Sequence, residues 1–126
     1  HNLTFGFDVS LPIGDMSAYV DRATAALVDR FGAGSRCWVY GHVADGNLHV
    51  NVWGPQFQPI DRRTVEEIVY QPLRAVGGSI SAEHGIGLEK KAYLNWSRTG
   101  AEIEVMRGLK RTLDPNWILN PGKIFD

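Results

Sequence analysis

The stretch WVYGHVADGNLHVNVW, residues 38–53, predicts a β-hairpin, and the rest of the fold can be built outward from it. Asp45-Gly46 is a dipeptide typical of two-residue hairpin turns, because glycine tolerates the left-handed backbone that these turns require. A turn at this dipeptide places His42 directly opposite His49 on the neighbouring strand. Side chains alternate between the two faces of a sheet, so the hairpin sorts into two chemically different faces.

One predicted face of the hairpin is apolar and suited to packing beneath helices: Val39, Gly41, Val43, Leu48, Val50 and Val52. The opposite face lacks the lysine, glutamate and threonine residues that are usual on a solvated sheet. It carries aromatic side chains, two histidines and an amide: Trp38, Tyr40, His42, His49, Asn51 and Trp53. This composition indicates a functional surface.

The two opposed histidines are candidate metal ligands. Directly opposed residues have Cβ atoms about 4.5–5.5 Å apart, so both imidazoles can reach one ion at ~2.0–2.1 Å. Glu83 ends a short alternating run on the same face, and two histidines with one carboxylate are common in catalytic metal sites. In the usual strand order Glu83 starts about two strand spacings, ~9.5 Å, from His49 and must turn inward to reach it. The alternative is a pair of half-buried histidines that hydrogen-bond and fill space.

The segments around the hairpin predict an α+β fold. Apolar spacing indicates a strand at 5–11, a helix at 15–31, strands at 36–43 and 48–53, a helix at 61–76 and a short strand at 79–83. The order β-α-β-β-α-β is that of a ferredoxin-like sandwich. Pro72 is expected to kink or break the second helix. Additional C-terminal helices are expected at 88–96 and 100–113, the latter with a capping box of Thr99 and Glu102.

Composition and charge narrow the class of protein. The 126 residues are 44% hydrophobic with a net charge of -1, which fits one globular domain and gives no reason to expect nucleic acid or an anionic membrane as partner. The single cysteine, Cys37, excludes an internal disulfide framework and is expected to pack as a thiol in the core. No apolar run reaches the ~20 residues of a transmembrane span, and we expect a cytoplasmic location. Lys90 and Lys91 are expected on a solvated helix face.

Three segments together resemble a known family: GHVADGNLHVNV (41–52), SAEHGIGLEKKAYL (81–94) and LDPNWILNPGKIF (113–125). Their order and content are similar to the carboxy-terminal domain of FAD-linked oxidases. This is the group of flavin dehydrogenases that includes glycolate oxidase, D-lactate dehydrogenases and D-2-hydroxyglutarate dehydrogenase. The resemblance covers almost the whole chain. It departs at Ala44 and Ala82, where the family usually has glycine, and at Gly6, near which some hydroxyacid-specific members carry lysine.

The resemblance implies a role for each candidate site residue. It implies that a divalent metal, Zn²⁺ or Mn²⁺, is bound by His42, His49 and Glu83. It also implies that His84 is the catalytic base and that Asn51 contacts the substrate. From the residues alone, a histidine at the start of the turn Gly85-Ile86-Gly87 is most simply part of a strand-to-helix connection.

The resemblance also implies that two domains of one protein contribute different parts of the reaction. The FAD would be held mainly by a flavin-binding domain of the same protein, amino-terminal to this one, because residues 1–126 form a single domain without a G-x-G-x-x-G phosphate loop. This chain would supply the substrate and metal site for oxidation of a small 2-hydroxy acid to the 2-oxo acid. The isolated chain is expected to carry no FAD, to be inactive, and to self-associate into a homo-oligomer through its exposed sheet face. The alternatives are a self-contained metal hydrolase and a non-catalytic ferredoxin-like ligand-binding module.

Overall fold

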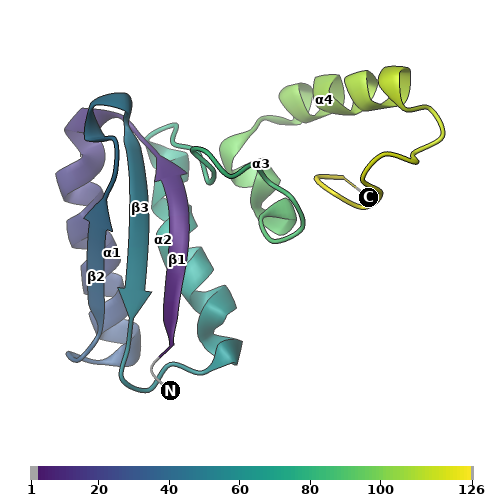
Figure 1. The fold of residues 1–126 in the computed structure, drawn as a ribbon. Coiled ribbons are helices and arrows are strands. Elements are labelled where there is room, and N and C mark those ends of the chain that lie inside the picture. The colour runs from purple at the N-terminus through teal and green to yellow at the C-terminus, as the bar shows by residue number, and fades with distance from the viewer. Residues whose placement is uncertain (1–2, 126) are drawn as a thin grey trace.

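A three-stranded antiparallel sheet and two long helices form the body of the molecule (Figure 1). The computed structural model describes residues 3–125. The strands β1 (Thr4–Ser10), β2 (Arg36–Tyr40) and β3 (Asn47–Trp53) lie in the order β1-β3-β2. The helices α1 (Met16–Phe31) and α2 (Arg62–Ala75) cover one face of the sheet, and α3 (Leu94–Ser97) and α4 (Gly100–Leu113) follow. The predicted α+β class is confirmed.

The core lies between this sheet and α1 and α2. β1 and β3 point alternate residues at the helices, and these side chains are at most 6% exposed: Phe5, Phe7, Val9, Leu48, Val50 and Val52. The helices contribute five side chains to the core, all at most 1% exposed: Tyr19, Leu27, Val65, Val69 and Leu73. The Tyr19 hydroxyl donates a hydrogen bond to the Val69 carbonyl at 3.0 Å and so ties α1 to α2. Within residues 3–125, no helix covers the other face of the sheet.

The loop between β2 and β3 differs from the predicted two-residue turn. β2 ends at Tyr40, and a 3-10 turn, η2 (Val43–Asp45), lies in the loop. Tyr40 is therefore the residue opposite His49, and the expected pairing of His42 with His49 is wrong. The register shift is two residues, so the strand side chains stay on their predicted faces, whereas Val43 leaves the core face and is 48% exposed.

Close backbone contacts at two glycines explain this longer loop. Gly41 has φ 142, and a Cβ there would lie 2.7 Å from the carbonyl oxygen of Asn47. Gly46 has φ 76, and a Cβ there would lie 2.7 Å from the carbonyl oxygen of Leu11. The Leu11 amide donates to the Gly46 carbonyl at 3.0 Å, which fastens the loop to the end of β1. The turn is thus shaped by its packing against β1 as well as by its own sequence.

The predicted fourth strand, 79–83, is reduced to a single bridge. Ser79 pairs with Ser10 through two backbone hydrogen bonds of 2.7 and 3.0 Å, beside the outer edge of β1. Beyond Ser79 the chain bends, because Glu83 and His84 donate their amides to the side chain of Asp8. The β-α-β-β-α-β order is retained with this shortened last member.

The helices follow their predicted positions with local differences. α2 continues past Pro72 to Ala75, so the expected break does not occur. Two 3-10 turns, η1 (Ile13–Asp15) and η3 (Pro59–Asp61), lead into α1 and α2. The helix expected at 88–96 begins only with η4 (Lys91–Tyr93) and α3. The capping box of α4 is confirmed: Glu102 donates its amide to Thr99 Oγ1 and its carboxylate accepts the Thr99 amide.

α4 and the carboxy-terminal loop lie away from the sheet and its two covering helices (Figure 1). Three apolar side chains of α4 are exposed by 59–79%: Val105, Leu109 and Leu113. Among residues 3–125, none of the helices combines the length and the apolar character needed to cross a membrane.

Candidate functional site

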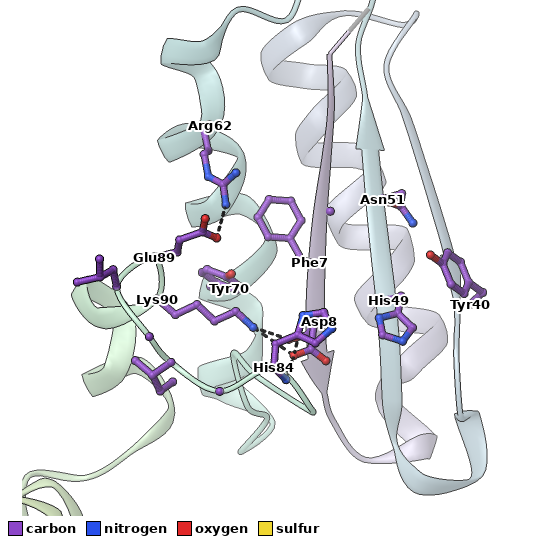
Figure 2. Close-up of a pocket in the computed structure, with 15 residues that line it drawn as sticks. Phe7, Asp8, Tyr40, His49, Asn51, Arg62, Tyr70, His84, Glu89 and Lys90 are labelled. Atoms are coloured by element: carbon purple, nitrogen blue, oxygen red, sulfur yellow. Dashed lines mark hydrogen bonds and ion pairs between the residues drawn. The ribbon is translucent and has the colours of Figure 1, made fainter. Parts of the chain in front are cut away.

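A cavity of about 430 Å³ lies along the outer edge of β1, between the sheet, α2 and the segment 84–90 (Figure 2). The sheet contributes Tyr40, His49 and Asn51, and α2 contributes Arg62 and Tyr70. Of the five site residues predicted from the sequence, His49, Asn51 and His84 line this cavity. The structure thus brings the proposed base, the proposed substrate contact and one proposed metal ligand to a single concave surface.

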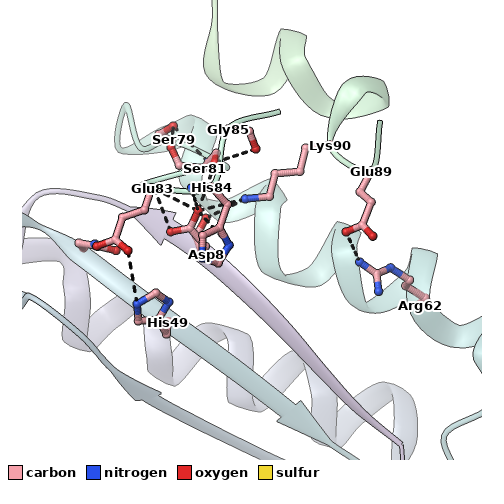
Figure 3. Close-up of polar contacts among 11 residues, drawn as sticks. Asp8, His49, Arg62, Ser79, Ser81, Glu83, His84, Gly85, Glu89 and Lys90 are labelled. Atoms are coloured by element: carbon pink, nitrogen blue, oxygen red, sulfur yellow. Dashed lines mark hydrogen bonds and ion pairs between the residues drawn. The ribbon is translucent and has the colours of Figure 1, made fainter. Parts of the chain in front are cut away.

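Asp8 is the buried polar centre of this region (Figure 3). It lies on β1 directly opposite His49 and is 1% exposed. Its carboxylate accepts hydrogen bonds from the backbone amides of Glu83, at 3.1 Å, and His84, at 3.0 Å. It also accepts the Ser81 hydroxyl and the Lys90 ammonium, both at 3.2 Å. One β1 side chain therefore anchors four polar groups of segment 81–90.

The surroundings of Asp8 keep its carboxylate ionised. Burial by itself raises the pKa of a carboxyl group, because it disfavours the charged form. The backbone hydrogen bonds from His84 and Glu83 and the nearby Lys90 ammonium act in the opposite direction and are stronger. The net result lowers the pKa of Asp8 from 3.8 to about 2.

This lowered pKa predicts an acid-sensitive contribution to stability. Since the folded-state pKa lies below the ordinary value, ionised Asp8 stabilises the fold above pH 4, and this contribution is lost between pH 4 and about 2. A shift of this size corresponds to about 2 kcal/mol of unfolding free energy. We expect urea unfolding of the wild-type chain to show this loss on acidification. The Asp8→Asn variant should lack that component, and parallel pH profiles for the two proteins would contradict the assignment.

Glu83 reaches His49 despite its distant start in the strand order. The Glu83 Oε2 atom lies 4.0 Å from His49 Nε2, and Asn47 Nδ2 donates to the other carboxylate oxygen at 2.5 Å (Figure 3). Two ligand atoms of one tetrahedral ion at ~2.1 Å lie about 3.4 Å apart, so the His49 and Glu83 atoms are near this separation but wider than it. Imidazole and carboxylate are donor types that Zn²⁺ and Mn²⁺ accept.

Asp8, His49 and His84 also offer ligand atoms within 4.8 Å of one another. Asp8 is the poorest donor of this trio, because its carboxylate already accepts several hydrogen bonds and the Lys90 ammonium lies 3.2 Å away. A divalent cation bound at Asp8 would be repelled by that ammonium. Of this trio, His49 and His84 keep donors available at the cavity, and Glu83 lies beside His49 without lining it.

His42 lies in the loop after β2 and is exposed. The cross-strand pairing that first connected it with His49 is wrong, because Tyr40 occupies that position. The metal-ligand role that the family resemblance gives to His42 is untested by the geometry and stays a prediction.

His84 faces the cavity from the start of the glycine-containing turn (Figure 2). Its side chain is 66% exposed, its Nδ1 atom lies 3.7 Å from Asp8 Oδ2, and its ring centre is 6.0 Å from that of His49. An accessible imidazole beside a fixed carboxylate is suited to accept a proton from a bound molecule. The base role of His84 remains a prediction that this position allows.

Sequence reasoning missed two residues that organise the site. Lys90 was expected on a solvated helix face, and this expectation is wrong: it is 9% exposed and paired with Asp8. Asp8 carried one usable signal, since it is a charged residue in the middle of an alternating strand with apolar neighbours. At the far wall, Arg62 binds Glu66 at 2.9 Å and Glu89 at 3.1 Å, which fixes the end of the cavity.

The fold and the cavity together define an α+β domain with an imidazole-lined site on its open sheet face. Comparison with known proteins identifies the family of this domain. Residues 2–124 match the family described as FAD linked oxidases, C-terminal domain, and the chain belongs to this family.

The chain is also similar to curated proteins called D-2-hydroxyglutarate dehydrogenase. It is 40% identical over 123 residues to the protein of Stutzerimonas stutzeri and 44% identical over 126 residues to that of Xanthomonas citri pv. viticola, covering 94% of this chain and 26% of each relative. A mitochondrial relative from Bos taurus is 39% identical over 122 residues, covering 96% of this chain and 22% of the relative. The chain thus spans about a quarter of the length of these relatives.

Proposed function

We propose that this chain is the substrate- and metal-binding domain of a FAD-dependent dehydrogenase that oxidises a 2-hydroxy acid to the 2-oxo acid. D-2-hydroxyglutarate is the first substrate to test, because curated relatives with 40 and 44% identity bear its name. The observation that carries the proposal is the shared cavity of His49, Asn51 and His84. A base, an amide and a metal-binding imidazole on one concave surface suit a small molecule that carries both a hydroxyl and a carboxylate.

Each residue has a distinct part in this proposal. His84 takes the proton of the substrate hydroxyl, and Asn51 hydrogen-bonds a substrate oxygen from the sheet. His49 and Glu83 hold the divalent metal, with His42 as the third ligand that the resemblance implies. A bound metal would make the substrate hydroxyl more acidic and help to fix its oxygen atoms.

The glycine-containing turn of segment 84–90 is not built like a dinucleotide phosphate loop. The turn Gly85-Ile86-Gly87 does not lead directly into a helix amino-terminus, as a dinucleotide phosphate loop would, since the next helical turn begins at Lys91. We therefore propose that FAD, which accepts the hydride in such enzymes, is held by a flavin-binding domain of the same protein. The residues of this chain then bind the substrate and the metal.

The test is made on the full-length protein that contains this chain, purified with its FAD. We expect D-2-hydroxyglutarate, mixed anaerobically with the enzyme, to bleach the flavin absorbance and yield one 2-oxo acid per reduced flavin. L-2-hydroxyglutarate, D-lactate and glycolate serve as comparison substrates. Flavin that stays oxidised with every one of these acids would refute the proposal. Hydrolysis of ester or phosphate substrates without flavin would instead support a metal hydrolase.

A further inference from the structure

Glu83 and His84 are adjacent in sequence, yet both side chains lie on the same side of the sheet as His49. Adjacent residues in a regular strand point to opposite faces. Here the Glu83 carboxylate is 4.0 Å from the His49 imidazole, and the His84 ring centre is 6.0 Å from that of His49. The chain must therefore leave the strand conformation at this point, and some group must hold it in the turned conformation.

Asp8 is the group that holds this turn (Figure 3). The backbone amides of Glu83 and His84 both donate to its carboxylate, at 3.1 and 3.0 Å. A strand would direct successive amides to opposite sides, whereas a turn can direct both to one acceptor. The Ser81 hydroxyl adds a third hydrogen bond to the same carboxylate at 3.2 Å.

Lys90 closes the other end of the segment. Its ammonium donates to the Asp8 carboxylate at 3.2 Å and to the Asp8 backbone carbonyl at 3.4 Å. Both partners of this pair are buried, with exposures of 1% for Asp8 and 9% for Lys90. The segment 81–90, of which residues 84–90 form one wall of the cavity, is therefore tied to β1 at both of its ends.

We propose that Asp8 is a positioning residue: with Lys90 as its counter-ion, its carboxylate holds the 81–85 turn so that Glu83 and His84 both face His49. This inference rests on the proposed function for the roles of Glu83 and His84. It assigns to Asp8 a part in assembling the site without binding metal or substrate itself.

The experiment uses the Asp8→Ala variant of the full-length protein and two independent measurements. Hydrogen exchange should show the amides of Glu83 and His84 slow in the wild type and fast in the variant, since their common acceptor is gone. Titration with Co²⁺ or Zn²⁺ should show metal affinity reduced by roughly 10- to 100-fold, the usual effect of removing a residue that orients a ligand. With D-2-hydroxyglutarate, kcat should fall more than KM rises.

The Asp8→Ala change leaves the buried Lys90 ammonium without its carboxylate partner and can therefore prevent folding. In that case the double variant Asp8→Ala with Lys90→Met is used in its place. Leu27→Ala, in α1 on the opposite side of the sheet, is the control for a general loss of stability. It should leave the 83–84 amides protected and metal affinity unchanged. Unchanged exchange at Glu83 and His84 in the Asp8 variants would overturn the inference, as would an equal loss of metal affinity in Leu27→Ala. A wild-type protein that binds no metal would refute the proposed metal site, while the exchange measurement would still decide the role of Asp8.

Discussion

His84→Asn in the full-length protein, purified with its FAD, is expected to slow flavin reduction by roughly 10²–10⁴-fold, the loss typical of removing a general base. An alcohol is a very weak acid, so the hydroxyl proton must be accepted by a base as the hydride leaves. Histidine suits this task near neutral pH, and His84 presents an accessible ring to the cavity. The measurement is anaerobic single-turnover reduction with saturating D-2-hydroxyglutarate.

Metal and FAD content decide how the result for His84→Asn is interpreted. Both should equal those of the wild type, because asparagine removes the base while the His84 amide still binds Asp8 through the backbone. Arg63→Gln is a suitable control, since Arg63 is exposed on α2 and its ion pair within residues 3–125 is with Glu67 in the neighbouring turn. A reduction rate for His84→Asn within a few-fold of the wild type would make His84 a structural residue of the turn.

His49→Ala is expected to abolish stoichiometric metal binding and substrate oxidation together. His49 is the only strand residue of the candidate ligand set, and its Nε2 atom faces Glu83 Oε2 at 4.0 Å. Loss of one ligand from such a set leaves too few donors to retain a divalent ion through purification. Elemental analysis of the purified protein, with flavin reduction measured in parallel, checks both expectations.

His42→Ala tests the predicted ligand that lies in the exposed loop after β2. The resemblance predicts that it loses metal as completely as His49→Ala does. If His42→Ala retains its full metal content, His42 is not a ligand, and His49 and Glu83 remain as the proposed protein ligands. Retention of full metal by His49→Ala would refute the metal site itself.

Local sequence patterns were sufficient for most of the architecture. The apolar spacing of α1 and α2 and the alternation of β1 and β3 require only neighbouring residues, and the capping box of Thr99 and Glu102 spans a single turn. The composition of the free sheet face was also predictable, since the register shift between β2 and β3 is two residues and side chains repeat every two. His49 and Asn51 therefore lie on the predicted face.

The details of the site were decided by contacts between residues far apart in the chain. The loop after β2 takes its shape from the close approach of Gly46 to Leu11. The last strand gives way to a turn because Asp8 accepts the amides of Glu83 and His84, about 75 residues further along the chain. The ion pair with the same carboxylate allows Lys90 to be buried, whereas the local sequence pattern predicts that Lys90 is exposed to solvent.

The sequence by itself therefore determined the helices α1, α2 and α4, the strands β1 and β3, and the residues on each face of these strands, because these depend on periodicities within a strand or a helix. Only the tertiary structure decided the register of β2, the inward turn of Glu83 and the pairing of Asp8 with Lys90. A buried charge is stable only when a partner reaches it, and which partner does so depends on how the whole chain folds.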